Sequence, residues 1–317
     1  MDKSKETPPL VTVIIPTYQR PTHLKKAIES VFQQTYRPLE LIVVDDNGFG
    51  TEFQKKTEKI IATTTQAEYV IKYLPLRRNG GACKARNAGI DLVEGEFIAF
   101  LDDDDEWCHE KIFLQVEIAK KTGTDLVYGG FCFINKEGDV DGNYIPAKLL
   151  SPLSDLFSGN VIGTTSVVLV RGENLKNVGG FDESLASCQD WDLWIRLAQA
   201  GSSFARVDKV ITRYHCSLSD RISTDSAKQI SGHCAMYFKY REMICKQPPH
   251  VQAHHARYIA NYLIKNGDPA QGRNCLLGSW RFQYWHPRFL LLMILSFFSR
   301  KSCAAIYKII QKTKAIV

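Results

Sequence analysis

Phe97-Ile-Ala-Phe-Leu-Asp-Asp-Asp-Asp105 is the stretch of sequence that decides the fold. It begins with a short apolar run, which is typical of a strand buried on both faces of a parallel sheet. Four aspartates follow directly, and adjacent carboxylates repel one another unless a cation neutralises them. The stretch therefore predicts a buried strand whose carboxyl end holds a cation.

Strand and helix patterns alternate on both sides of this stretch. Strand patterns lie at residues 10–15, 39–44, 69–76 and 125–128, and helical patterns lie at 21–32, 82–93 and 109–121. This alternation predicts a doubly wound α/β sheet, in which ligands bind at the carboxyl ends of the strands. We expect Pro16 to end the first strand. Later segments are mostly helical, so we expect one domain over residues 1–225 and a helical extension over 226–317.

Polar side chains follow three of the expected strands. Thr17 and Tyr18 come after the first, Asp45 and Asp46 after the second, and residues 102–105 after the strand quoted above. Carboxylate oxygens of this kind suit hard cations such as Mg²⁺ or Mn²⁺. A bare acidic run is usually a solvated turn. Its place beside a second aspartate pair favours a cation site instead.

Five motifs occur in a fixed order along the chain. They are Val11-Thr-Val-Ile-Ile-Pro-Thr-Tyr18, Leu41-Ile-Val-Val-Asp-Asp-Asn47, Asn79-Gly-Gly81 with Ala85-Arg-Asn-Ala-Gly89, Phe100-Leu-Asp-Asp-Asp-Asp105, and Gly179-Gly-Phe-Asp-Glu183 with Gln189-Asp-Trp-Asp-Leu-Trp-Ile-Arg-Leu197. In these motifs the chain resembles the inverting family 2 glycosyltransferases of the GT-A fold. The resemblance covers about residues 9 to 222, and it implies transfer of a sugar from a nucleotide-activated donor.

The resemblance also implies which residues bind the nucleotide and the metal. The implied nucleotide-binding residues are Pro16, Thr17, Tyr18, Asp45, Asp46, Gly81, Arg86 and Asp103. Asp102 and Asp104 match the DXD pair that holds Mn²⁺ or Mg²⁺ on the diphosphate, although a run of four aspartates leaves the register open by one residue. His215 matches a segment where related enzymes place a histidine near the diphosphate or metal.

A carboxylate base is also needed, because the acceptor hydroxyl loses its proton during attack. The resemblance assigns this role to Asp190, in a motif that usually begins Glu-Asp. Here Gln189 replaces the glutamate, which removes a neighbouring charge. Asp192 is expected to serve the start of the helix, where the helix dipole favours acidic side chains.

Charge is distributed unequally along the chain. Residues 1–225 contain 26 Lys and Arg against 32 Asp and Glu, whereas residues 226–317 contain 14 against 2. The net charge of the second part is therefore +12, which predicts an acidic partner. No base-reading motif is present, so we expect an anionic membrane surface rather than nucleic acid.

The apolar run Phe289–Phe298 supports this expectation. Ten residues are too few to span a bilayer as a helix, but a basic, apolar segment suits an interfacial helix. A buried core helix is the alternative. The helical patterns at 288–299 and 304–312 form the end of this region. Among the histidines at 250, 254 and 255, the pair spaced by four residues is expected to lie on the surface, because no third metal ligand is evident.

Cellular location follows from two weaker features. Nine cysteines are scattered singly, which fits reduced thiols in a cytosol. The polar start shows no secretory signal. We therefore expect a cytoplasmic protein, peripheral on the inner face of the membrane.

The predicted function is metal-dependent, inverting transfer of a hexose, with UDP-sugar the favoured donor and a glycan or lipid-linked hydroxyl the acceptor, in surface polysaccharide synthesis. A catalytically inactive glycan-binding or nucleotide-binding module is the first alternative. A sugar-1-phosphate nucleotidyltransferase is less favoured, because no Gly-rich phosphate loop follows the first strand.

Overall fold

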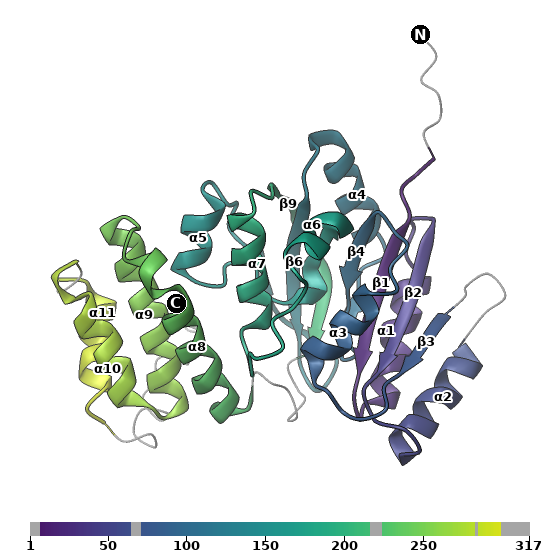
Figure 1. The fold of residues 1–317 in the computed structure, drawn as a ribbon, viewed down its shortest axis with the longest axis horizontal. Helices are drawn as coiled ribbons and strands as arrows, with labels where there is room; N and C mark the ends of the chain where they lie inside the picture. The colour runs from purple at the N-terminus through teal and green to yellow at the C-terminus, as the bar shows by residue number, and fades with distance from the viewer. Residues whose placement is uncertain (1–6, 65–70, 216–223, 283–284, 299–317) are drawn as a thin grey trace, which may run out of the picture. The chain divides into compact units, whose positions relative to one another are not determined.

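The computed structural model describes residues 7–64, 71–215, 224–282 and 285–298 (Figure 1). Its strands are β1 (Val11–Thr17), β2 (Leu39–Asp45), β3 (Ile71–Pro75), β4 (Phe97–Phe100), β5 (Asp105–Trp107), β6 (Leu126–Ile134), β7 (Val140–Tyr144), β8 (Val168–Arg171) and β9 (Phe204–His215). Its helices are α1 (Pro21–Phe32), α2 (Glu52–Thr64), α3 (Ala82–Ile90), α4 (Lys111–Thr122), α5 (Pro152–Ser158), α6 (Gly172–Asn177), α7 (Gln189–Gln199), α8 (Ser226–Ile244), α9 (Pro249–Asn266), α10 (Pro269–Gly278) and α11 (Pro287–Leu295), with 3-10 turns η1 (Thr165–Val167) and η3 (Trp280–Phe282).

Two compact units divide the chain. Unit 1 comprises Met1–Leu150, Ile162–Glu183 and Arg196–Leu218, and unit 2 comprises Ser151–Val161, Ser184–Ile195 and Ser219–Val317. Each unit is built from three separate segments of the chain, so the units do not correspond to one boundary. The domain boundary after residue 225 stays a prediction.

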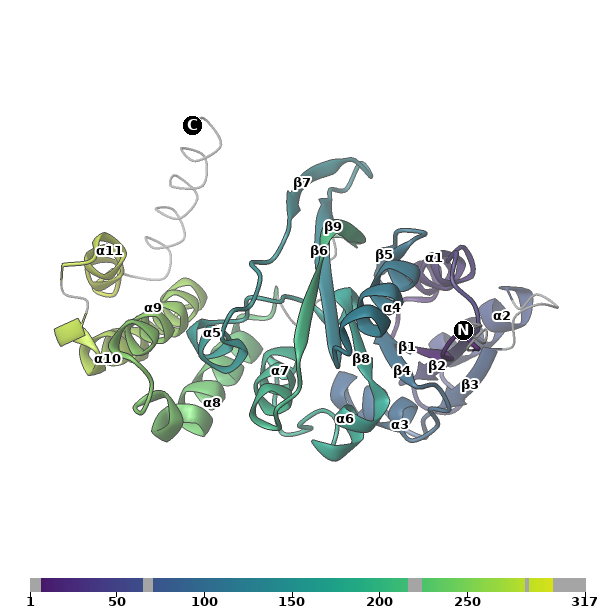
Figure 2. The ribbon, with the colours of Figure 1, turned by 90° about the horizontal axis from the view of Figure 1, so that it is seen from above.

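Unit 1 contains the sheet, whose strand order is β3-β2-β1-β4-β8-β6-β9-β5, with β7 paired to β6 (Figure 2). The first four strands in this order are parallel, as the apolar runs predicted. The strand β8 pairs antiparallel with both β4 and β6. The α/β fold is therefore confirmed, and the second half of the sheet is mixed.

Helices cover both faces of the parallel strands because side chains of β1 alternate between the faces. Val13 and Ile15 belong to an apolar core that also includes Leu24 and Ile28 of α1. On the other face Gly89 of α3 lies so close to the sheet that a Cβ there would come within 2.7 Å of a methyl of Ile14. Close packing on both faces holds the carboxyl ends of these strands in place.

The expectation that Pro16 ends the first strand was wrong, because β1 continues to Thr17. The Leu101 N–H donates to the Ile14 carbonyl. The backbone N–H and C=O groups of even-numbered residues of β1 therefore point toward β4. Pairing with β4 ends at Ile14 opposite Phe100. Pro16 therefore occupies a position where β4 offers no partner for a backbone N–H, and a proline is tolerated there.

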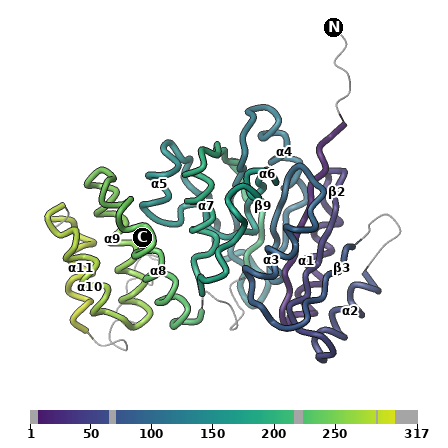
Figure 3. The backbone as a smooth tube through the Cα atoms, in the orientation of Figure 1, coloured from purple at the N-terminus to yellow at the C-terminus, as the bar shows by residue number. Residues whose placement is uncertain are grey.

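Unit 2 is helical, as the pattern beyond residue 225 predicted (Figure 3). Asp225 caps α8 by accepting from the N–H groups of Ala227 and Lys228. The helix α9 ends at Gly267, whose φ of 108° favours glycine. Asp268 then caps α10. None of the described helices combines the length and the apolar character that crossing a membrane requires, and the helix predicted at 304–312 lies outside the described residues.

Two histidines are buried in the packing of unit 2, whereas the predicted surface pair, His250 and His254, is exposed. His233 stacks on Tyr262 with ring centroids 4.1 Å apart. His255 lies 2.7 Å, through Nδ1, from the Phe157 carbonyl. Burial lowers the pKa of both histidines from 6.5 to about 4. Both rings are therefore neutral in the folded protein at neutral pH.

Acid should destabilise unit 2. Below pH 6.5 the unfolded chain binds protons that the folded chain excludes, so the stability that the neutral rings provide is lost as pH falls toward 4. We expect a loss of about 2 kcal/mol per histidine between pH 7 and pH 5. Denaturant unfolding of wild type, His255→Gln and the exposed-site control His250→Gln at both pH values measures it. Equal pH dependence in all three proteins would contradict the assignment.

Candidate active site

The ends of three neighbouring strands bring the predicted site residues of unit 1 together. The strands β2, β1 and β4 are adjacent and parallel, so their carboxyl ends meet at one edge of the sheet. Thr17 and Asp45 lie opposite one another in the register. The aspartates at 102–105 follow β4 at the same edge.

Three of these aspartates form a cluster. One carboxylate oxygen from each of Asp102, Asp104 and Asp105 lies within 4.8 Å of the other two. Asp104 and Asp105 are only 5% and 1% exposed, so the alternative of a solvated acidic turn was wrong. A partly buried set made only of carboxylate oxygens fits Mg²⁺ or Mn²⁺ by its donor chemistry.

Two arginines neutralise part of this charge. Arg86 on α3 lies 2.6 Å, through Nη2, from Asp102 Oδ1, and its guanidinium packs over the Phe181 ring. Arg20 lies 2.6 Å, through Nη1, from Asp104 Oδ2. The carboxylates of the cluster would repel one another without these two cations, so the arginines stabilise the cluster.

Asp103 faces a different neighbour. Its carboxylate accepts from the Thr17 hydroxyl at 2.8 Å and from the Tyr18 N–H at 3.2 Å, and it also pairs with Arg20. Burial and the adjacent Asp104 carboxylate raise the pKa of Asp103. Asp103 therefore ties the end of β1 to the acidic segment and lies outside the cluster of three.

Asp46 organises the Gly-rich turn before α3. It accepts from the N–H groups of Gly80 and Gly81 at 2.7 and 2.8 Å and from Asn79 Nδ2 at 3.0 Å. Burial raises the pKa of Asp46, although the two glycine N–H groups oppose this shift. Gly81 has a φ of +86°, which a larger residue adopts only with strain.

Asp45 is fully buried and acts within the protein. One of its oxygens accepts from Asn47 and the other accepts from the Tyr73 hydroxyl at 2.6 Å. Tyr18, in contrast, exposes 44% of its surface, while Pro16 is buried. The exposed ring is therefore the part of this motif that a ligand can contact.

His215 is not part of the acidic cluster among the described residues. Its Nε2 lies 2.9 Å from Glu106 Oε1, across the β5–β9 pairing. The contact with His215 lowers the pKa of Glu106. A role of His215 at the metal stays a prediction.

Asp190 lies at the start of α7, as predicted. Asn160 Nδ2 donates to Asp190 Oδ2 at 3.0 Å, and the Trp191 N–H donates to Oδ1 at 2.8 Å. Gln189 donates its amide to the Leu185 carbonyl at 3.1 Å, a bond that a glutamate could not make when ionised. The Gln therefore fits the local structure of this turn.

Asp192 is buried rather than exposed at the helix start. It accepts from the Tyr240 hydroxyl and lies 2.7 Å from Lys239 Nζ. These contacts tie the first turn of α7 to α8. Asp192 therefore has a structural role, as predicted. The structure shows that it acts through the side chains of Tyr240 and Lys239 rather than through the helix dipole alone.

Known proteins share these motifs. The family described as Glycosyl transferase family 2 matches residues 12–168. WcaA of Escherichia coli K12, a glycosyl transferase named for colanic acid biosynthesis, is 30% identical over 241 residues, which are 74% of this chain and 82% of that protein. The chain belongs to glycosyl transferase family 2. The chain spans 33% and 36% of the length of similar glycosyltransferases from Rickettsia bellii and Rickettsia conorii, but 74% of one from Rickettsia typhi.

Solved structures agree on the fold of this family 2 protein. S. aureus TarS 1–349 in complex with UDP-GlcNAc has a TM-score of 0.56 at 17% identity, over 94% of this chain and 91% of that one. A Pyrobaculum calidifontis mannosyltransferase in complex with GDP-Man and Mn²⁺ has a TM-score of 0.58 at 16% identity, over 95% of this chain and 87% of that one. The GT-A fold is therefore confirmed.

Sequence patterns missed several residues that contact the predicted site residues within each unit. Arg20 lies two residues after the first motif, and a basic residue so close in the chain to a predicted site could have been singled out. No sequence signal points to Ser166. Its hydroxyl donates to Asp105 Oδ2 at 2.8 Å, and the two residues are far apart in the chain. Asn160, which contacts Asp190, also lies in a loop without a recognisable pattern.

Proposed function

We propose that this chain transfers a hexose from a nucleotide-sugar donor, with UDP-sugar favoured, to a hydroxyl of a glycan or lipid-linked acceptor, with inversion and with a divalent cation. The cluster of Asp102, Asp104 and Asp105 at the carboxyl edge of the sheet carries the proposal. A Mg²⁺ or Mn²⁺ ion bound there would act as a Lewis acid toward the negative charge of the departing nucleoside diphosphate. Family membership and the biosynthetic name of WcaA support a place in surface polysaccharide synthesis.

The nucleotide is held by the ends of β1 and β2 in this proposal. Tyr18 offers an exposed ring on which a base can stack. Asp46 already accepts three hydrogen bonds, and a carboxylate has about four acceptor sites, so it can accept one more from the base or ribose. We reassign Asp45 to positioning, because its oxygens serve Asn47 and Tyr73.

In this proposal other residues neutralise the diphosphate charge and accept the proton of the acceptor hydroxyl. The Arg86 and Arg20 guanidiniums would interact with diphosphate oxygens, a role supported by their contacts with the carboxylates of the cluster. The Asp190 carboxylate accepts the proton of the attacking hydroxyl, and Asn160 and the Trp191 N–H orient it. An oriented base lowers the entropic part of the barrier.

We also propose that unit 2 brings the enzyme to the cytoplasmic face of a membrane. The side chains of Leu290, Leu291 and Ile294 on α11 are 49%, 39% and 58% exposed, which supports an interfacial helix over a wholly buried one.

A donor screen tests the proposed function. Among UDP-, GDP- and dTDP-sugars, we expect one class to raise the melting temperature by several degrees in the presence of Mn²⁺, and UDP-sugars are favoured. A ligand at 100 times its Kd stabilises the folded protein by about 2.7 kcal/mol. Thermal shift with and without Mn²⁺ measures this, and release of UDP with glycan acceptors measures transfer. Binding without any release would favour the inactive module, and no shift with any donor would reject the proposal.

A further inference from the structure

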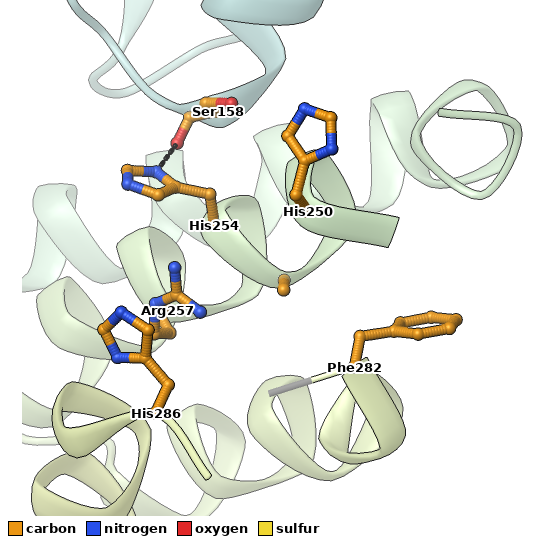
Figure 4. A pocket seen from close by; sticks show the side chains of 7 residues that line it. Ser158, His250, His254, Arg257, Phe282 and His286 are labelled. Carbon is orange, nitrogen blue, oxygen red and sulfur yellow. Dashed lines mark hydrogen bonds between the residues drawn. The ribbon is translucent and has the colours of Figure 1, made fainter. Parts of the chain in front are cut away.

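A pocket of about 260 Å³ opens within unit 2, away from the residues assigned above. It is lined by Ser158, His250, Ala253, His254, Arg257, Phe282 and His286. Figure 4 shows the three imidazoles, the guanidinium and the Phe282 ring arranged around it. None of the described lining residues is acidic. The pocket therefore brings one guanidinium and three imidazoles to one small volume.

Positive charges around this pocket act on one another. Burial and then Arg288 lower the pKa of Arg257. Burial, Arg257, Arg288 and His254 lower the pKa of His286. These shifts have the direction expected where like charges face a common space, and an anion in that space would relieve the repulsion.

Hydrogen bonds orient the rings toward a ligand. The Arg288 N–H donates to His286 Nδ1 at 3.1 Å, so the proton of the neutral ring is on Nε2, where it can be donated. His254 Nδ1 lies 3.3 Å from the Ser158 carbonyl, which fixes the plane of that ring. Arg257 and the Nε2–H of His286 therefore provide donors suited to the oxygens of a phosphate, whereas the Nδ1 proton of His254 is donated to the Ser158 carbonyl.

Apolar side chains begin where the pocket residues end. The helix α11 starts directly after His286. Exposed apolar residues of this part of the chain are Trp280 (56%), Trp285 (62%), Leu290 (49%), Leu291 (39%), Ile294 (58%), Phe297 (72%) and Phe298 (45%). Tryptophans of this kind are enriched at membrane interfaces. A ligand that uses both features has an anionic head and an apolar tail.

We propose that the pocket of His254, Arg257 and His286 binds the phosphate of an anionic lipid headgroup while the exposed side of α11 enters the membrane interface. The net charge of +12 over residues 226–317 is complementary to such a surface. A free phosphate would use the donors but leave the apolar side chains in water. The inference rests on the membrane contact proposed above and adds a specific headgroup site to it.

Vesicle binding by the full chain tests the proposal. Flotation with vesicles of phosphatidylcholine alone, and of phosphatidylcholine with phosphatidylglycerol, compares three variants with wild type. The pocket variant Arg257→Gln/His286→Gln should bind the anionic vesicles at least about tenfold more weakly, the effect of losing charge-assisted hydrogen bonds. The control Lys265→Gln removes an exposed charge from α9 outside the pocket and should weaken binding by no more than about fivefold.

The third variant, Leu291→Gln/Ile294→Gln, separates the two features. It should weaken binding to both kinds of vesicle, because it removes exposed apolar area and no charge. Thermal melts establish that each variant is folded. Should the pocket variant fail to fold, wild-type histidine Hε1 resonances provide the measurement: submicellar dihexanoyl phosphatidylglycerol should shift those of the pocket histidines more than inorganic phosphate at the same concentration.

Each other outcome has a defined meaning. A pocket variant that binds anionic vesicles as well as Lys265→Gln overturns the headgroup site and leaves the membrane contact standing. Equal resonance shifts with inorganic phosphate and with the lipid identify free phosphate as the ligand, which also overturns it. Wild type that binds neither vesicle removes the membrane contact itself, whereas the donor screen still tests sugar transfer separately.

Discussion

Asp190→Asn is expected to lower the turnover rate of sugar transfer by about 10²–10⁴-fold, the usual contribution of a general base. The asparagine keeps the size of the side chain and can still accept one of the two hydrogen bonds that Asp190 now receives, from Asn160 Nδ2 at 3.0 Å or from the Trp191 N–H at 2.8 Å. What it loses is the ability to take a proton from the acceptor hydroxyl. Initial rates with the donor found by the screen measure the effect.

Nucleotide affinity distinguishes this loss from misfolding. We expect the Kd for the nucleotide of Asp190→Asn to stay within about twofold of wild type, because the base is assigned to the acceptor step. The matched control is Asp208→Asn, an exposed carboxylate on β9 that pairs with Arg206, and it should transfer sugar normally. An Asp190→Asn enzyme with near-normal turnover would refute the base assignment.

Asp104→Asn should remove most of the dependence of nucleotide binding on Mn²⁺. Asp104 contributes one of three carboxylate oxygens that lie within 4.8 Å of one another, and an amide is a much poorer ligand for a hard cation than a carboxylate. We expect the Mn²⁺-dependent gain in nucleotide affinity to fall by about a hundredfold, since even the outer partners of a metal site are worth 10–100-fold. Calorimetric titration of UDP with and without Mn²⁺ measures this gain.

Asp103→Asn is the matched comparison for the metal prediction. Asp103 faces Thr17 and Tyr18, so its loss should weaken nucleotide binding equally with and without Mn²⁺. EDTA should bring wild type to the affinity of Asp104→Asn. The opposite pattern, in which only the change at Asp103 abolishes the metal effect, would show that the DXD register is shifted by one residue.

The sequence predicted where the acidic residues lie relative to the strands, because strand ends are local features. An apolar run followed by aspartates identifies the end of β4 without any knowledge of the fold, and the same holds for Asp45 and Asp46 after β2. Short segments such as β5 and β7 were not predicted, because their pairing partners lie far away in the chain. Their formation depends on the sheet that receives them.

The roles of adjacent aspartates were beyond the reach of the sequence. Asp102 and Asp104 look equivalent to Asp103 in the chain, yet only Asp103 turns toward β1. Asp46 accepts from the Gly-rich turn while its neighbour Asp45 is fully buried against Tyr73. Successive side chains point in different directions, so the surroundings of each carboxylate depend on which distant segments pack beside it.

The sequence by itself determined the family, the α/β class and the edge of the sheet that carries the acidic residues, since each follows from the order and spacing of local motifs. Tertiary structure alone decided that Arg20 and Ser166 contact the aspartates, that Asn160 holds Asp190, and that His254 and His286 share a pocket. These contacts join segments that are distant in the chain. They arise when packing brings the segments together, and local periodicity contains no information about that step.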